Sequence, residues 1–144
     1  MSKRRKLLFA ASQSPAIQSS HFDPNVAIQS LILFSFKHLT FDRKPFECTT
    51  KDADGMLYVL KTFKIFSQIQ RNTLERSYPN CHLVPDDQIH RHNLMDFIAK
   101  APNKKLHQLG RRDTPERIVG YFDSPYSNHF QVCLFDLKHN LSGD

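Results

Sequence analysis

Apolar and polar residues alternate along two runs near the C-terminus, residues 117–123 and 129–137. Both runs are rich in aromatic and β-branched residues, which is typical of β-strands. Between them, residues 124–128 read SPYSN, and proline, serine and asparagine are common in turns. The pattern predicts a terminal antiparallel β-hairpin in which Asp123 lies opposite His129.

The register that follows from this pair assigns the remaining residues to the two faces of the hairpin, because side chains alternate along a strand. Moving away from the loop, the expected pairs are Tyr121 with Gln131, Val119 with Cys133, and Arg117 with Phe135. One face is expected to join the core and collects Ile118, Phe122, Phe130, Val132, Leu134 and Asp136. The other is expected to line a half-exposed groove, because it mixes polar and aromatic groups: Arg117, Val119, Tyr121, Gln131, Cys133, Phe135 and His139. An ordinary sheet face with solvated polar side chains is the alternative.

Toward the N-terminus, residues 31–41 read LILFSFKHLTF, a dense apolar run that predicts a mostly buried strand. Arg43, Lys44 and Pro45 interrupt it. Residues 46–49 can then return as a second short strand, which gives an N-terminal hairpin.

The longest helix is predicted for residues 54–74, because residues 50–54 supply threonine and aspartate for a helix start. Its apolar stripe contains Met56, Leu60, Phe63, Phe66 or Ser67, and Gln70, widened by Leu57, Val59, Ile65 and Ile69. The polar side holds Lys61, Lys64, Gln68 and Arg71, which is either a solvated surface or a binding face.

Residues 77–102 contain loop signals and a short helical pattern at residues 89–100. Residues 104–109 predict a third strand beside the terminal hairpin, followed by Arg111 and Arg112. The expected fold class is therefore α+β, with a small antiparallel sheet and one long and one or more short helices packed on it.

The chain has 144 residues, which is the usual size of one domain. We assign residues 25–144 to a single α+β domain and residues 1–24, with four cations at positions 3–6, to a flexible basic arm. The formal net charge of +6 favours an anionic partner, either nucleic acid or an acidic surface.

Three cysteines without paired spacing argue against a disulfide framework and favour a reducing compartment. No run approaches the roughly 20 apolar residues of a membrane span, so a cytoplasmic protein without a membrane partner is expected. Cys81, His82, His90 and His92 are zinc-ligand types, but they lack the paired spacing of zinc sites. We therefore expect no metal and no cofactor.

The terminal segment also carries the chemistry of a metal-free ribonuclease. The unperturbed pKa of a histidine side chain lies near neutrality, so His139 is the candidate general acid or base toward a ribose hydroxyl. Arg117 can hold a phosphate through two hydrogen bonds, and Tyr121 can orient the ribose. Further contacts to RNA are expected from Arg111, Arg112, Gln131 and Lys138. The alternative for His139 is a surface histidine at the end of a strand.

Residues 117–122 (RIVGYF), 130–135 (FQVCLF) and 136–139 (DLKH) resemble the terminal strands and polar motif of the RelE/ParE/YoeB toxin superfamily. The resemblance implies helices on one face of an antiparallel sheet, and a metal-independent endoribonuclease toxin with an antitoxin partner. The chain is more closely similar to a family of small bacterial proteins without an assigned function. These proteins share residues 34–37 (FSFK), Cys81-His82, the strand at residues 117–121 and the final D-x-x-H-x-L run.

Two further functions stay open. The same basic face suits a nucleic-acid-binding module without turnover, with aromatic rings stacked on bases. Alternatively, the sheet edge or the long helix meets a protein partner, as in a subunit of a toxin-antitoxin or defence complex. Phosphate-loop, nucleophile-elbow and zinc-helix motifs are absent from the sequence, so other enzyme classes receive little support. A cysteine nucleophile would require Cys81 or Cys133 to meet a histidine in space.

Overall fold

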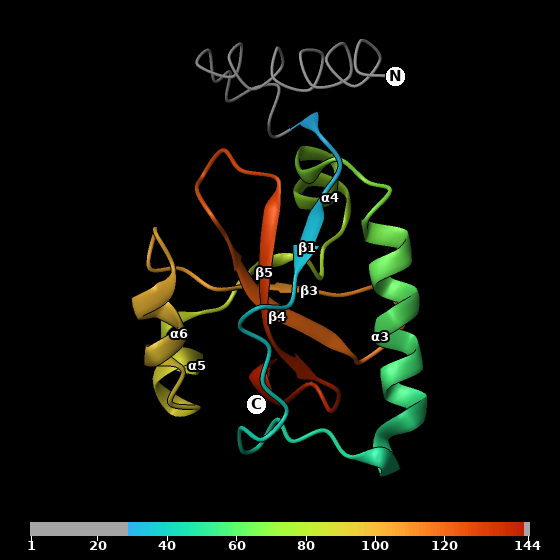
Figure 1. The fold of residues 1–144 in the computed structure, drawn as a ribbon, viewed down its shortest axis with the longest axis vertical. Coiled ribbons are helices and arrows are strands. Elements are labelled where there is room, and N and C mark those ends of the chain that lie inside the picture. Colours follow the sequence, from blue (N-terminus) through green and yellow to red (C-terminus); the bar gives the residue numbers. More distant parts are fainter. Residues whose placement is uncertain (1–28, 143–144) are drawn as a thin grey trace, which may run out of the picture.

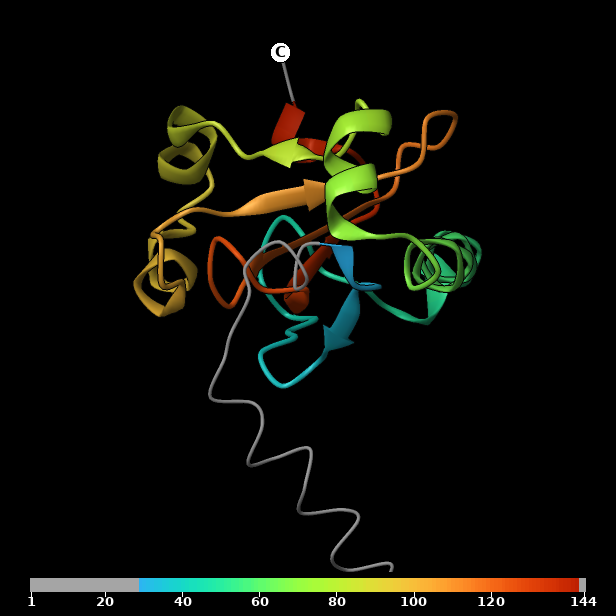
Figure 2. The same cartoon turned by 90° about the horizontal axis from the view of Figure 1, so that it is seen from above.

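The structure, a computed structural model, describes residues 29–142. In this part of the chain, five strands form one sheet in the order β1-β5-β4-β3-β2, and helices lie on both sides of it (Figures 1 and 2). The strands are β1 (Leu33–Ser35), β2 (His82–Leu83), β3 (His107–Leu109), β4 (Arg117–Phe122) and β5 (His129–Asp136). The helices are α3 (Ala53–Phe66), α4 (Arg71–Ser77), α5 (Asp86–Arg91) and α6 (Met95–Lys100), with short 3₁₀ helices η1 (Thr50–Asp52) and η2 (Asn140–Ser142). The predicted combination of a sheet with one long and several short helices is confirmed. The predicted N-terminal arm, residues 1–24, lies outside the described residues.

The predicted antiparallel sheet is wrong in one pair: the sheet is mixed, because β1 runs parallel to β5 while the other neighbouring strands are antiparallel. The predicted N-terminal hairpin is wrong: β1 ends at Ser35, and residues 46–49 form no strand. β1 obtains its strand partner from β5, so it does not need a return strand next to it in the sequence. Phe46 instead lies in the core beside α5 and α6.

The terminal hairpin is confirmed, and so is its register near the loop, where Tyr121 pairs with Gln131. Farther from the loop the predicted pairs are wrong by one residue, because a β-bulge shifts the register between Val119 and Gly120. Val119 pairs with Leu134 rather than with Cys133. At Gly120 the strands approach so closely that an added Cβ would lie 2.0 Å from the Gln131 carbonyl oxygen. Glycine is therefore required at the bulge.

The bulge also changes which residues share a face. Phe130 and Val132 pack toward α3, as predicted for the core face, but Cys133 and Leu134 both pack toward α5 and α6. Phe135 then returns to the α3 side. The predicted half-exposed groove is wrong, because α5, α6 and Phe46 cover that face and build a second core on it.

The long helix α3 begins at Ala53, one residue before the predicted start, directly after η1, whose capping box is formed by Thr49 and Asp52. It ends at Phe66 rather than at position 74. Residues 69 and 70 pair with the backbone of the segment before β1 instead of continuing the helix. The Ile32 N–H donates to the Ile69 carbonyl oxygen at 3.2 Å, and Leu31 and Gln70 form an isolated antiparallel β-bridge. The predicted apolar stripe is wrong at Leu57, Leu60 and Ile65, whose side chains are exposed, Leu60 most of all at 61%.

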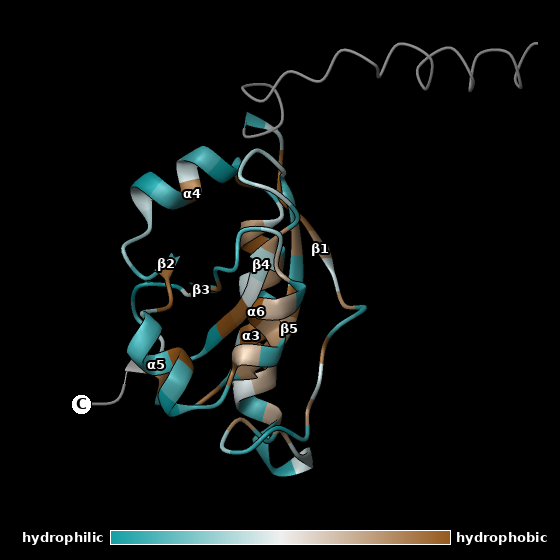
Figure 3. Ribbon diagram, turned by 90° about the vertical axis from the view of Figure 1, so that its left-hand side faces the viewer, coloured by the Kyte–Doolittle hydropathy of each residue, from teal (hydrophilic) through white to brown (hydrophobic). Residues whose placement is uncertain are grey.

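The predicted helix at residues 89–100 is divided into α5 and α6, because Asn93 between them has a φ of 55°. Asparagine tolerates this left-handed conformation better than most residues. Figure 3 shows hydrophobic residues concentrated on the central strands, with hydrophilic segments outside them on α4 and α5. Within residues 29–142, none of the helices is both long and apolar enough to cross a membrane.

We expect Gly120→Ala to destabilise the protein by about 3 kcal/mol, because the new methyl group must push two paired strands apart. Gly55→Ala is the matched control: there the added Cβ meets only the flexible Leu137 side chain, at 3.3 Å, and alanine favours a helix by up to about 1 kcal/mol. Urea unfolding monitored by circular dichroism measures both changes. Equal stability of the two variants would contradict this role of the bulge.

Candidate functional site

Arg117, expected to hold a phosphate, lies in the interior and is 4% exposed. Its Nη1 donates to the carbonyl oxygens of Thr114 and Glu116, the latter at 2.9 Å. Its side chain fills the space above Gly110, where an added Cβ would lie 2.3 Å from the Arg117 Cδ. Burial lowers the pKa of Arg117, and the Asp136 charge opposes that shift. The guanidinium is therefore committed to the protein's own backbone.

Tyr121 is also 4% exposed. Its ring stacks on that of His38, with 6.3 Å between the ring centroids, and burial raises the pKa of its hydroxyl. Gln131 pairs with it across the hairpin and donates to the Asp123 carboxylate at 3.0 Å. The structure thus brings Tyr121 and Gln131 together, as predicted, but within a covered layer.

His139 lies in the turn after β5, half-buried and with a φ of 59°. The turn is organised by the buried carboxylate of Asp136, which accepts from the backbone N–H groups of Asn140 at 2.8 Å and Leu141 at 2.9 Å. Lys138 beside it is exposed. His139 is at the same end of the hairpin as Arg117, whose register partner is Asp136. Tyr121 is four residues farther along β4, about 13 Å at strand rise. No open surface therefore joins all three residues assigned to catalysis.

Arg111 occupies a different surface, beside the outer face of α3. Its Nε donates to the hydroxyl of the buried Thr62 at 2.9 Å, and its Nη2 donates to the Tyr58 carbonyl at 3.4 Å. The Asn80 side-chain amide donates a hydrogen bond to the Arg111 carbonyl oxygen at 2.9 Å. Arg112, next to it, is exposed. The guanidinium is therefore fixed in place, with part of it open to solvent.

A cavity of about 280 Å³ lies between this arginine and the helix. We call it the α3 basic pocket, and it is lined by Lys61, Lys64, Ile65, Gln68 and Arg111. Lys61 and Lys64 are exposed, and among the described residues neither they nor Arg111 form an ion pair. Three cations thus share one hollow without a carboxylate partner, which favours binding of an anion.

Tyr58 lies beside the pocket and is 42% exposed. The Lys61 ammonium is 5.4 Å and the Arg111 guanidinium 5.8 Å from the centre of its ring. These cations flank an accessible aromatic surface on which a base can stack. Tyr58 had no role in the sequence analysis, and a tyrosine one helical turn before Lys61 was the signal that could have identified it.

Arg71 was assigned to the polar side of the helix, and this is wrong. It is 6% exposed, its guanidinium lies 3.7 Å from the centre of the Phe122 ring, and it donates to the carbonyl oxygens of Ser124 and Ser127. Arg71 therefore closes the loop between β4 and β5 and is unavailable for a ligand.

Cys81 and its neighbouring histidines do not converge. Cys81 is buried and directed at the Gly110 carbonyl, 3.6 Å away, and burial raises the pKa of its thiol to about 11. His82 donates from Nδ1 to the Leu83 carbonyl at 2.8 Å and accepts from the Gln108 amide at 3.1 Å. Residues 29–142 contain no group of three or more histidine, cysteine or acidic side chains that could hold a metal ion.

His107 has the most strongly lowered pKa of the described histidines. Burial, and secondarily the charges of Arg71, Lys105 and His82, lower it from the ordinary value of 6.5 to about 4. Its ring packs edge-on against Phe122 at 5.2 Å, and its buried Nδ1 has no hydrogen-bond partner. This environment is that of a neutral, partly buried histidine, and His107 does not line the α3 basic pocket.

We expect the free energy of unfolding to fall as pH decreases from 6.5 toward 4, because the unfolded chain binds a proton at His107 before the folded protein does. Between pH 7.5 and 4.5 the loss from this residue is about 2.5 kcal/mol, and it reaches about 3 kcal/mol below pH 4. Urea titrations at pH 7.5 and 4.5 measure it. His107→Gln should remove most of the pH dependence, and the exposed His90→Gln should not. The same pH dependence in the wild type and His107→Gln would contradict the assignment.

Comparison with known protein families, with curated proteins and with solved structures finds no match to this chain. Membership of the RelE/ParE/YoeB superfamily therefore stays a prediction.

Proposed function

We propose that this protein is an RNA-binding module that holds single-stranded RNA at the α3 basic pocket. The observation that carries the proposal is the convergence of Lys61, Lys64 and Arg111 on one hollow without an acidic partner. Cations that are unpaired in the free protein can neutralise phosphates and release their counterions, which is the main source of affinity for nucleic acids.

The exposed ring of Tyr58 favours single-stranded over double-stranded RNA. Bases of a single strand are free to stack on an aromatic side chain, whereas those of a duplex are already stacked on each other. Arg112 is exposed next to Arg111 in the chain. It therefore adds a further cation that a phosphate of the bound RNA strand can contact. The net charge of the whole chain, +6, has the sign required for this partner.

The geometry favours binding over cleavage. Arg117 and Tyr121 are buried, so the cations and hydroxyl that a ribonuclease requires do not surround His139. The turn that carries His139 contacts the first turn of α3, where Leu137 meets Gly55. Lys64 is nine residues farther along the helix, about 14 Å at helical rise. A RelE-like metal-independent endoribonuclease, and an antitoxin or other protein partner, stay predictions.

Replacing Lys61, Lys64 and Arg111 by alanine should weaken binding of a labelled RNA of about 12 nucleotides by roughly 10- to 100-fold at 0.1 M salt. The slope of log affinity against log salt should also become shallower by about 2, because three phosphate contacts are lost. Fluorescence anisotropy over a salt series measures both quantities.

The matched control is Lys100→Ala, Lys104→Asn and Lys105→Ala, which removes three exposed cations near α6, on the other side of the sheet. Asparagine is used at position 104 because Lys104 has a φ of 53°, and asparagine tolerates this left-handed conformation better than alanine does. This variant has the same net charge as the pocket variant. Equal loss of affinity in both would contradict a specific site and indicate attraction by net charge alone.

Cleavage is tested in the same samples. Purified protein is incubated with mixed RNA in EDTA beside His139→Ala, and products are separated on a gel. The binding proposal predicts intact RNA in both. Cleavage that survives EDTA and disappears in His139→Ala would overturn the non-catalytic proposal and establish a metal-independent ribonuclease.

A further inference from the structure

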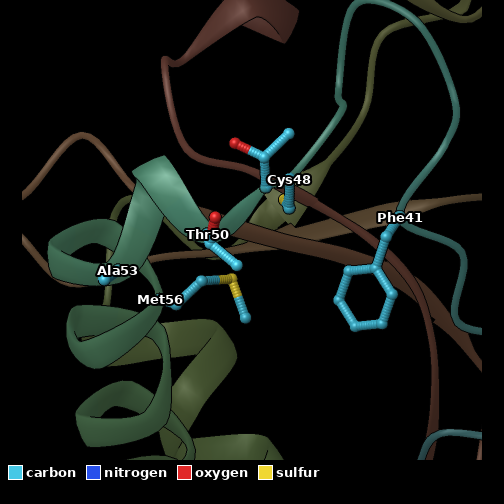
Figure 4. Close-up of a pocket in the computed structure, with 6 residues that line it drawn as sticks. Phe41, Cys48, Thr50, Ala53 and Met56 are labelled. Carbon is cyan, nitrogen blue, oxygen red and sulfur yellow. The ribbon is translucent and has the colours of Figure 1, made fainter.

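The N-terminal end of α3 borders a second cavity, which is larger and chemically different from the α3 basic pocket. Its volume is about 600 Å³, and it is lined by Phe41, Cys48, Thr49, Thr50, Ala53 and Met56. Figure 4 shows the Phe41 ring and the Met56 side chain on opposite sides, with the Cys48 side chain between them. We call this cavity the Cys48 pocket.

The walls of the Cys48 pocket are mostly carbon and sulfur. No charged side chain lines it, although Lys51 and Asp52 are adjacent in the chain. The Asp52 carboxylate is engaged in the capping box, where it accepts from the Thr49 N–H at 2.8 Å, and the Thr49 hydroxyl accepts from the Lys51 N–H at 3.2 Å. The Thr49 and Asp52 side chains therefore have hydrogen-bond partners within the cap.

Phe41 contributes an accessible ring to the pocket. It is 42% exposed, yet it is held by the Phe135 ring of the core, 5.9 Å away between centroids. Cys48 and Met56 are half-buried and pack against the same core. These side chains are held in place by the core and are still accessible to solvent. Such an apolar surface suits a ligand, because little side-chain conformational entropy is lost on binding.

We propose that the Cys48 pocket binds a small, uncharged aromatic molecule. Its volume lies within the roughly 300–1,000 Å³ typical of small-molecule sites, and its lack of charged walls excludes the phosphates that suit the α3 basic pocket. An aromatic ring between Phe41 and Met56 gains edge-to-face contact with the phenyl ring and sulfur contact from the thioether. The proposal is independent of RNA binding.

The probe for this proposal is N-phenyl-1-naphthylamine, a neutral aromatic dye whose fluorescence increases in apolar surroundings. The full chain should bind it saturably. Ala53→Phe places a ring inside the cavity, where it occupies the space of the dye, and should weaken binding about tenfold or more, which corresponds to about 1.4 kcal/mol. Met56→Gln keeps the side-chain length but removes the sulfur, and it should also weaken binding. This second variant tests the proposal even where Ala53→Phe fails to fold.

Cys48 supplies a second, independent measurement. Burial raises the pKa of the Cys48 thiol, which slows its reaction, but Cys81 and Cys133 are buried, so a disulfide reagent such as 5,5′-dithiobis(2-nitrobenzoate) should react with Cys48 first, in a separate faster phase. Saturating dye should slow this reaction at least about tenfold in the wild type, which corresponds to 90% occupancy. Cys48→Ser should remove the rapid phase and identify the thiol.

Leu60→Ala is the control for non-specific adsorption, because Leu60 is the most exposed large apolar residue of α3 and does not line the pocket. It should leave dye binding within about twofold of the wild type. The Lys61, Lys64 and Arg111 alanine variant should also bind the dye normally, which separates this site from the RNA site. Absence of saturable binding, unchanged binding in both Ala53→Phe and Met56→Gln, or no protection of Cys48 would overturn the proposal.

Discussion

The close contact between Gly120 and the backbone of Gln131 is the constraint on which the rest of the structure depends. It places a β-bulge in the central pair of strands, so that Cys133 and Leu134 face α5 and α6 while Val132 and Phe135 face α3. Both faces of the sheet thereby acquire an apolar core. As a result, the surfaces available for a ligand lie on the outer sides of the helices and the connecting loops, rather than on the sheet.

The cationic residues serve two different purposes. Arg71 and Arg117 are buried, and their guanidinium groups bind backbone carbonyl oxygens of the hairpin loop and of the approach to β4. Lys61, Lys64 and Arg111 remain open to solvent around one hollow. Net charge alone does not distinguish these groups, because a buried arginine and an exposed one count equally. The functional proposal therefore depends on which cations the fold leaves unpaired.

Local patterns predicted the parts of the fold that local interactions determine. Strand alternation and the SPYSN turn identified the hairpin and its register near the loop, and the threonine and aspartate residues of segment 50–54 marked the start of the long helix. Long-range pairing decided the rest. The parallel contact between β1 and β5 joins residues almost a hundred positions apart, and pairing of residues 69–70 with 31–32 breaks a helix whose periodicity continues across that point. Arg71 was misplaced for the same reason, because its predicted face assumed an unbroken helix.

The candidate site was predictable only in part. Arg111 was selected from sequence, but its neighbours Lys61 and Lys64 are about fifty residues away in the chain and were assigned mainly to a solvated helix surface. The most direct test of the central claim is to map amide chemical-shift changes by NMR as single-stranded RNA is added. RNA binding at the α3 basic pocket predicts changes centred on residues 58–68 and 111–112; changes centred on the turn around His139, with α3 unaffected, would contradict it.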